Sequence, residues 1–322
     1  MKNTPKWMMF LSLAMVLILG ACSSNSASGA EQVTAGEQVK YTITGTDPGS
    51  GLMRLTAQAM EDYDLSNWTL TESSAAGMTA QLDAAYNNKQ LIVFVAWSPH
   101  WMFNTYDLKY LDDPKLTYGE PEEIHTIARL GLKDDHPVAY EFLDRFHWTA
   151  DDMGEVMIDI QNGMDAESAA SKWVEENEAK VQEWIEGLEP VNGDPFTLSF
   201  VMWDSELAST SVVRYVLEEK LGYKAEALQV EIGPMWIGVA NGDVDAMVAA
   251  WLPVTHADYW ERYADQLDDL GANMVNVKSG LAVPAYMEDV NSIEDLKSYT
   301  ELYTMWEGTF RIYHGGLPFL AI

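Results

Sequence analysis

The feature that most constrains this fold is an internal repeat, because two stretches of the chain alternate apolar runs with helix-period segments in the same order. The first stretch covers residues 39–97 and the second covers residues 196–251. Short apolar runs bounded by Gly, Asp and Pro are typical of buried parallel strands, and the segments between them have the apolar spacing of helices. The sequence therefore predicts two β-α-β-α-β units that form two facing lobes, with a ligand site at the carboxyl ends of their strands.

The segment between the two units is predicted to be helical. Apolar residues recur at helical spacing in 136–146, 150–161 and 166–185, and Thr149 and Asp165 are well placed as N-caps. A turn-rich stretch, 189–195, then separates the units. We accordingly divide the chain into a first α/β unit with a helical extension (39–190), a second α/β unit (195–297) and a tail without an assigned role (298–322).

The N-terminus indicates an exported lipoprotein. Lys2 and Lys6 precede an apolar run, 7–19, which is about as long as the apolar region of a signal peptide. The run ends in Leu19-Gly20-Ala21-Cys22, which resembles the lipobox of bacterial lipoproteins, and Cys22 is the chain's single cysteine. We expect a signal peptide (1–21), lipid attachment at Cys22 and a small, polar tether (22–38) that holds the protein outside the cell membrane. The alternative is an ordinary secretory signal.

The composition narrows the class of partner. The chain has 50 Asp and Glu against 19 Lys and Arg, a formal net charge of −31. Nucleic acid is an implausible partner, because binding phosphates requires cations. The acids are spread along the chain, which favours a solvated acidic shell suited to a saline or alkaline exterior over an acidic ligand site. Beyond the leader there is no run of 18 apolar residues, so we expect contact with the membrane through the lipid alone.

Three tryptophans are the candidate ligand contacts. Trp97, Trp203 and Trp251 each stand at the carboxyl end of a predicted strand, at similar places in the two units. One such residue could simply cap a core, but three at matching positions favour a binding site. Indole faces attract a quaternary ammonium group, which cannot donate a hydrogen bond, by about 0.5–2 kcal/mol each when desolvated. No buried acid is then needed.

A second set of residues fits an anion. Residues 48–51 form a glycine turn before a predicted helix, whose first N–H groups, those of Gly51 and Leu52, lack intrahelical acceptors. If the anion is a carboxylate of the ligand, His256 can donate a further hydrogen bond to it. His100 is its counterpart in the first unit but lies two positions earlier relative to the tryptophan. The alternative is an ordinary strand–helix turn with two structural histidines.

The glycine turn, the segments around the three tryptophans and His256, and residues 123–129 and 153–157 all resemble motifs of one family. Over residues 40–297 the chain resembles the glycine betaine-binding lipoproteins of Gram-positive ABC importers. The resemblance implies an α/β, two-lobed class II periplasmic-binding-protein fold with a hinge, in the subgroup with swapped halves. It also implies an ammonium cage of Trp97, Trp203 and Trp251, and a carboxylate site of Gly51, Leu52 and His256. The expected partners are a small betaine ligand and a permease with a separate ATPase. We expect a monomer, no cofactor and no metal. The family is expected to end near Lys297, so the tail extends beyond it.

Two alternatives stay open at this point. The first keeps the receptor but changes the ligand to proline betaine, carnitine or choline. The second is a secreted hydrolase, for which Asp204 and Glu206 beside Trp203 are the candidate carboxylates. The sequence contains no Gly-x-Ser-x-Gly, His-Glu-x-x-His or phosphate-loop motif, so we expect a receptor and not an enzyme.

Overall fold

The computed structural model describes residue 36 and residues 39–297. All of them belong to one compact unit, Thr34–Ile322. The expected signal peptide, Cys22 with almost all of its tether, and the tail 298–322 lie outside the described residues.

The predicted repeat is confirmed. The first unit consists of β1 (Thr42–Thr44), α2 (Gly51–Asp62), β2 (Thr69–Thr71), α3 (Ala75–Asn87) and β3 (Val93–Ser98). The second consists of β6 (Pro195–Phe200), α10 (Asp204–Tyr215), β7 (Lys224–Gln229), α11 (Ile232–Asn241) and β8 (Ala246–Leu252). In each unit the first strand lies in the middle and pairs in parallel with the other two, as short βαβ connections require.

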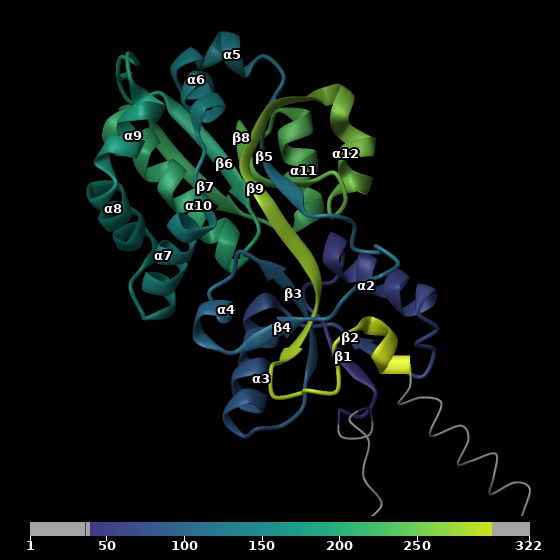
Figure 1. The fold of residues 1–322 in the computed structure, drawn as a ribbon. Helices are drawn as coiled ribbons and strands as arrows, with labels where there is room; N and C mark the ends of the chain where they lie inside the picture. The colour runs from purple at the N-terminus through teal and green to yellow at the C-terminus, as the bar shows by residue number, and fades with distance from the viewer. Residues whose placement is uncertain (1–35, 37–38, 298–322) are drawn as a thin grey trace, which may run out of the picture. The chain divides into compact units, whose positions relative to one another are not determined.

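One long strand, β9 (Leu267–Pro284), belongs to the sheets of both units (Figure 1). Its first part, up to Val277, runs antiparallel to β5 (Glu122–Arg129), and its second part, from Lys278, runs antiparallel to β3. The short strand β4 (Leu108–Tyr110) pairs with its end. We call residues 39–121 with 278–297 lobe 1, and residues 122–277 lobe 2. Within 39–297 the chain thus passes between the lobes twice, before β5 and within β9.

The helical stretch between the units packs on lobe 2. It contains α5 (Leu132–Asp135), α6 (Pro137–Arg145), α7 (Ala150–Gln161), α8 (Ala166–Glu176) and α9 (Glu178–Ile185), of which α7 and α8 contact α10. Thr149 and Asp165 cap α7 and α8 as predicted, because their side chains accept hydrogen bonds from the N–H groups of Asp152 and Ser168. The lobes of the structure therefore differ from the sequence units, since these helices join the second sheet.

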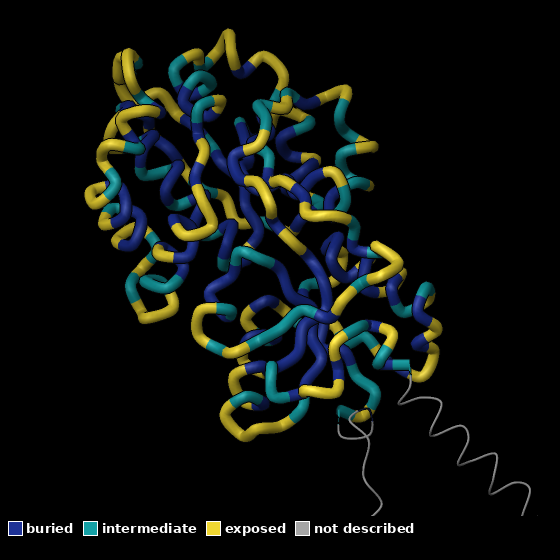
Figure 2. The backbone as a smooth tube through the Cα atoms, viewed as in Figure 1, coloured by how far each residue is buried: buried dark blue, intermediate teal, exposed yellow. Residues whose placement is uncertain are grey.

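The core follows the strands. β3 and β8 are buried along almost their whole length, and Figure 2 shows the strands largely in dark blue with exposed residues in loops and on outer helix turns. In lobe 2 the buried indoles of Trp173 and Trp184 stack at 5.9 Å between α8 and α9. Residues 39–297 also contain the short α4 (Met102–Thr105) and α12 (Ala257–Tyr263), a π-helical turn at Val216–Lys220 and a 3-10 turn at Ala264–Gln266. Within the described residues, no helix combines the length and apolar character needed to cross a bilayer.

Candidate ligand-binding site

A small cavity between the two lobes brings together five of the six predicted site residues. Its lining consists of Thr46, Ser50, Leu52, Trp97, Trp203, Ser205, Trp251, Thr255, His256 and Ser279. Trp97 lies near the end of β3, Trp251 near the end of β8, and Trp203 is the N-cap residue of α10 directly after β6. Trp97 and Trp251 thus occupy the same place in the two units, and Trp203 adds a third indole from the loop that follows β6.

The edges of two of the cavity's indoles form hydrogen bonds across the lobes. The Nε1–H of Trp97, in lobe 1, donates to Ser205 Oγ of lobe 2 at 3.2 Å. The Nε1–H of Trp203, in lobe 2, donates to Asp47 Oδ2 of lobe 1 at 2.9 Å. Because an indole N–H lies in the ring plane, these bonds fix the rings without using their faces. Sequence reasoning found both indoles but neither of their acceptors.

Asp47 is held by several donors besides Trp203. Its Oδ2 also accepts from the Thr46 hydroxyl at 3.0 Å and from the N–H of Ala75, the first residue of α3, at 3.1 Å. A carboxylate is favoured at a helix N-terminus because the unpaired N–H groups and the helix dipole stabilise negative charge. These donors satisfy the carboxylate of Asp47 within the protein. Asp47 is not among the residues that line the cavity.

His256 presents a single free donor to the cavity. Its side chain is fully buried, and its Nδ1 accepts the N–H of Trp251 at 3.0 Å, so the ring proton of the neutral form resides on Nε2. Nε2 is buried and has no hydrogen-bond partner among the described residues. Burial, with a smaller contribution from Arg54, lowers the pKa of His256 to about 3. A neutral imidazole with an unsatisfied N–H therefore faces this space.

The start of α2 supplies the other predicted donors. Ser50 caps the helix: its side chain accepts from the N–H of Met53 at 3.3 Å and its carbonyl from the N–H of Arg54 at 3.2 Å. The N–H groups of Gly51 and Leu52, in the first turn, have no intrahelical acceptor. Gly51 lies directly against lobe 2, because a Cβ built on it would stand 1.7 Å from the carbonyl oxygen of Thr255. The absence of a side chain permits this approach.

A buried glutamate that the sequence did not single out holds the loop before His256. Glu122 is 2% exposed, and its Oε2 accepts the N–H groups of Val254 and Thr255 at 3.0 and 2.9 Å. The Thr255 hydroxyl donates to Oε1 and lies 3.2 Å from Ser279 Oγ on β9. The loop is thus tied to both segments that connect the lobes. The sequence offers only two adjacent glutamates here, Glu122 and Glu123, and nothing distinguishes the buried one.

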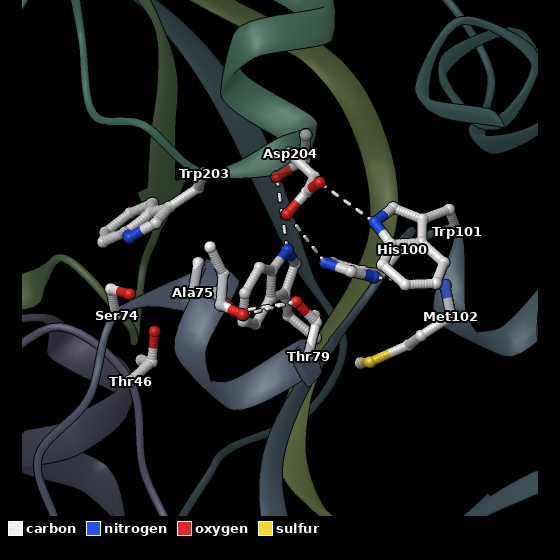
Figure 3. Close-up of polar contacts among 12 residues, drawn as sticks. Thr46, Ser74, Ala75, Thr79, His100, Trp101, Met102, Trp203 and Asp204 are labelled. Carbon is white, nitrogen blue, oxygen red and sulfur yellow. Dashed lines mark hydrogen bonds and ion pairs between the residues drawn. The ribbon is translucent and has the colours of Figure 1, made fainter. Parts of the chain in front are cut away.

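The two acids of the hydrolase alternative do not line the cavity. Asp204 accepts from Trp101 Nε1 at 2.9 Å and lies 3.3 Å from His100 Nε2 (Figure 3). Glu206 is buried, and its Oε2 accepts the N–H of Val201 at 2.8 Å. Burial raises the pKa of Glu206 to about 8 against this backbone bond, so the side chain is protonated at neutral pH. In the described part of the chain, no three His, Cys, Asp or Glu residues gather into a possible metal site.

Comparison with known proteins identifies the family of this chain. Residues 24–176 and 194–318 match the family described as the substrate binding domain of ABC-type glycine betaine transport system, OpuAC. The chain belongs to this family. It is also 50% identical, over 289 residues, to the glycine betaine/carnitine transport binding protein GbuC of Listeria monocytogenes serotype 1/2a (strain 10403S), covering 89% of this chain and 96% of that protein. The predicted family and its two-lobed α/β fold are confirmed.

Solved structures of the same kind are also similar. Lactococcal OpuAC, closed and complexed with glycine betaine, is 43% identical with a TM-score of 0.43, over 47% of this chain and 59% of that one. ProX of Borrelia burgdorferi is 35% identical with a TM-score of 0.45, over 47% and 58%. The family match runs to residue 318, so the expectation that the family ends near Lys297 is wrong, and most of the segment 298–322 lies within the family's own length.

The protonated Glu206 predicts a pH-dependent stability. Its folded pKa of about 8 exceeds the usual 4.5, so its favourable contribution is complete below about pH 4.5 and is lost as the pH rises through 8. We expect Glu206→Gln to lie close to the wild type at pH 5 and to be more stable by roughly 4–5 kcal/mol at pH 8.5, at about 1.4 kcal/mol per pKa unit. Urea unfolding at both values measures this gain. The exposed control Glu219→Gln should show none, and an equal gain at both pH values would contradict the assignment.

Proposed function

We propose that this chain is the extracytoplasmic receptor that binds glycine betaine, or a closely related quaternary ammonium zwitterion, for an ABC importer. One observation carries the proposal: a single cavity is lined by three tryptophans and by a buried histidine whose Nε2–H has no partner among the described residues. The same cavity thus offers aromatic surface to a methylated cation and a donor to an anion. The family and the Listeria relative, whose name specifies glycine betaine and carnitine, support this ligand class.

We place the ammonium group of the ligand among Trp97, Trp203 and Trp251. A trimethylammonium group has no N–H, so its attraction to protein comes from contact with the negative faces of aromatic rings, about 0.5–2 kcal/mol per ring when water is excluded. None of the residues that line the cavity is acidic. The site therefore avoids the desolvation cost of a buried carboxylate, and it selects a large, weakly hydrated cation over a small hydrated one.

The carboxylate end belongs at the start of α2 and at His256. The N–H groups of Gly51 and Leu52 have no intrahelical acceptor, and the helix dipole favours an anion beside them. His256 adds one N–H from the other lobe. Satisfying a buried donor that is otherwise unpaired contributes about 1–3 kcal/mol, which favours a carboxylate-bearing betaine over choline.

Transport follows from the division of these residues between the lobes. Gly51, Leu52 and Trp97 lie in lobe 1, whereas Trp203, Trp251 and His256 lie in lobe 2. A ligand contacts all of them only in the closed form, so binding shifts the population toward closure. We propose that the closed receptor, held at the outer face of the membrane by lipid at Cys22, delivers its ligand to a permease that a separate ATPase drives.

The decisive experiment is calorimetric titration of the full chain, purified in a non-ionic detergent and in high salt that screens its negative charge. Glycine betaine, carnitine, choline and unmethylated glycine serve as ligands. Saturable one-to-one binding of glycine betaine, with no binding of glycine, supports the proposal. The absence of binding by all three methylated ligands overturns it.

The first prediction concerns the cage. Trp97→Ala, Trp203→Ala and Trp251→Ala should each weaken glycine betaine binding by at least about 1 kcal/mol, because each removes one desolvated cation–π contact. Titration of each variant measures the loss. Trp68→Ala is a matched control, since Trp68 is equally buried (5% exposed) but packs on Tyr41 in lobe 1. This control should lower the melting temperature and leave the affinity of the folded protein unchanged. Unaltered affinity in all three variants would show that these tryptophans do not form a cage for the ligand.

The second prediction concerns the carboxylate. His256→Ala should weaken binding of glycine betaine by about tenfold or more and change choline binding far less, because only the betaine carboxylate accepts from Nε2–H. The measurement is the ratio of the two affinities in wild type and variant. Equal losses for the two ligands would mean that His256 shapes the cavity and does not bind the carboxylate.

The third prediction concerns closure. Gly51→Ala should fold normally, because the backbone of Gly51 is not left-handed and alanine favours a helix by about 1 kcal/mol. Its methyl group would nevertheless collide with the Thr255 carbonyl oxygen of lobe 2, so glycine betaine affinity should fall by more than tenfold while the melting temperature without ligand is kept. Gly154→Ala, in α7 with open space around it, is the matched control and should bind as the wild type does. Wild-type affinity in Gly51→Ala would show that closure tolerates a side chain there.

A further inference from the structure

The repeat provides two equivalent histidines, His100 in lobe 1 and His256 in lobe 2. Both are buried, at 2% and 0% exposure. Each uses Nδ1 to accept a backbone N–H, from Met102 at 3.2 Å and from Trp251 at 3.0 Å. In the neutral form of each ring the proton is therefore on Nε2, and each histidine presents one N–H donor near the boundary between the lobes.

The Nε2 atoms of the two histidines have different surroundings. His256 Nε2 faces the ligand cavity and has no partner in the described part of the chain. His100 Nε2 also forms no hydrogen bond among the described residues, but it lies 3.3 Å from Oδ2 of Asp204, whose Oδ1 accepts from Trp101 Nε1 at 2.9 Å. Figure 3 shows His100 and Trp101 side by side, both facing the carboxylate of Asp204. Asp204 is the first residue of α10 and belongs to lobe 2, whereas both of its partners belong to lobe 1.

We propose that Asp204 is a built-in carboxylate that His100 and Trp101 bind on lobe 1 as His256 would bind the ligand carboxylate on lobe 2, and that this contact latches the closed form. The inference rests on the proposed function, because it takes the ligand carboxylate as the counterpart. The carboxylate is suited to this role: although burial opposes ionisation, the close contact with His100 and the hydrogen bond from Trp101 lower the pKa of Asp204, so it remains charged.

The neighbours of Asp204 strengthen this assignment. Three consecutive residues at the start of α10 each bond across to lobe 1: Trp203 to Asp47, Asp204 to Trp101 and His100, and Ser205 to Trp97. Trp203 and Ser205 line the cavity, but Asp204 does not. Asp204 is thus a positioning residue that stabilises closure without touching the ligand.

This distinction has a measurable consequence. When binding requires a closed form, the apparent affinity is reduced by the fraction of molecules able to close. Loss of a latch that does not touch the ligand lowers this fraction equally for every ligand. A residue that contacts the ligand, by contrast, changes affinity by a factor that depends on the ligand.

The test uses Asp204→Asn in the full chain, titrated with glycine betaine and with carnitine. We expect both affinities to fall by the same factor, roughly tenfold, as a buried charge-assisted hydrogen bond implies. Stopped-flow tryptophan fluorescence should assign this loss to faster dissociation. In a double-mutant cycle, His100→Ala with Asp204→Asn should be little worse than either change alone. The control is Asp258→Asn, because Asp258 also pairs across the lobes, with Arg54 at 3.0 Å, but in solvent; it should change affinity less than twofold.

A second readout needs no ligand. Dyes on Asn88→Cys in lobe 1 and Asp243→Cys in lobe 2, in a Cys22→Ser background, report the closed fraction of the free protein by single-molecule energy transfer. Asp204→Asn should lower this fraction. If the wild type binds no betaine and the fraction still falls, the latch stands and the proposed function does not. Unchanged affinities, a loss confined to one ligand, or an unchanged closed fraction would each overturn the latch.

Discussion

A single strand shared by both sheets determines how the two lobes can move. β9 pairs with β5 up to Val277 and with β3 from Lys278, so continuous backbone hydrogen bonds lead into each sheet, and only the crossing is left to bend. The hydrogen-bonded group of Glu122, Thr255 and Ser279 stands at this crossing. This group joins the crossing to the loop that carries His256, so we expect a movement at the crossing to move that loop as well.

In the proposed cage, closure also resolves a conflict between two demands on each indole. A ligand-facing indole must leave its faces free, yet its N–H cannot be buried unpaired without a cost of about 1–3 kcal/mol. Trp97 and Trp203 meet both demands by bonding their edges to Ser205 and Asp47 on the opposite lobe. Opening returns these N–H groups to water, where they are equally satisfied. On this account these two bonds favour neither form, and a small ligand can shift the balance between them.

The parts of this structure that the sequence predicts are those set by local pattern. The βαβαβ repeat, the caps Thr149 and Asp165 and the strand-end tryptophans all follow from spacing and turn chemistry. β5 and most of β9 were not predicted, because their polar and apolar residues alternate irregularly and they pair across more than 130 positions. The helical extension joins lobe 2 through contacts with α10 that only packing determines. Likewise, His100 lies two positions closer to Trp97 than His256 lies to Trp251, so the sequence assigned it no role. The structure places Asp204 beside it.

The location of charge explains how an acidic protein can recognise a cationic group selectively. The chain carries a net charge of −31, and yet the residues that line the cavity include no acid. The nearby acids do not present a free charge to the cavity: Glu206 is protonated, Asp47 is held by donors on both lobes, and Asp204 accepts a hydrogen bond from Trp101 of lobe 1. A bare carboxylate in the cavity would attract any cation of a saline exterior. Indole faces instead favour a cation that gives up its water easily. The acidic surface, screened within about 10 Å, therefore contributes little to specificity, which depends on the uncharged cavity.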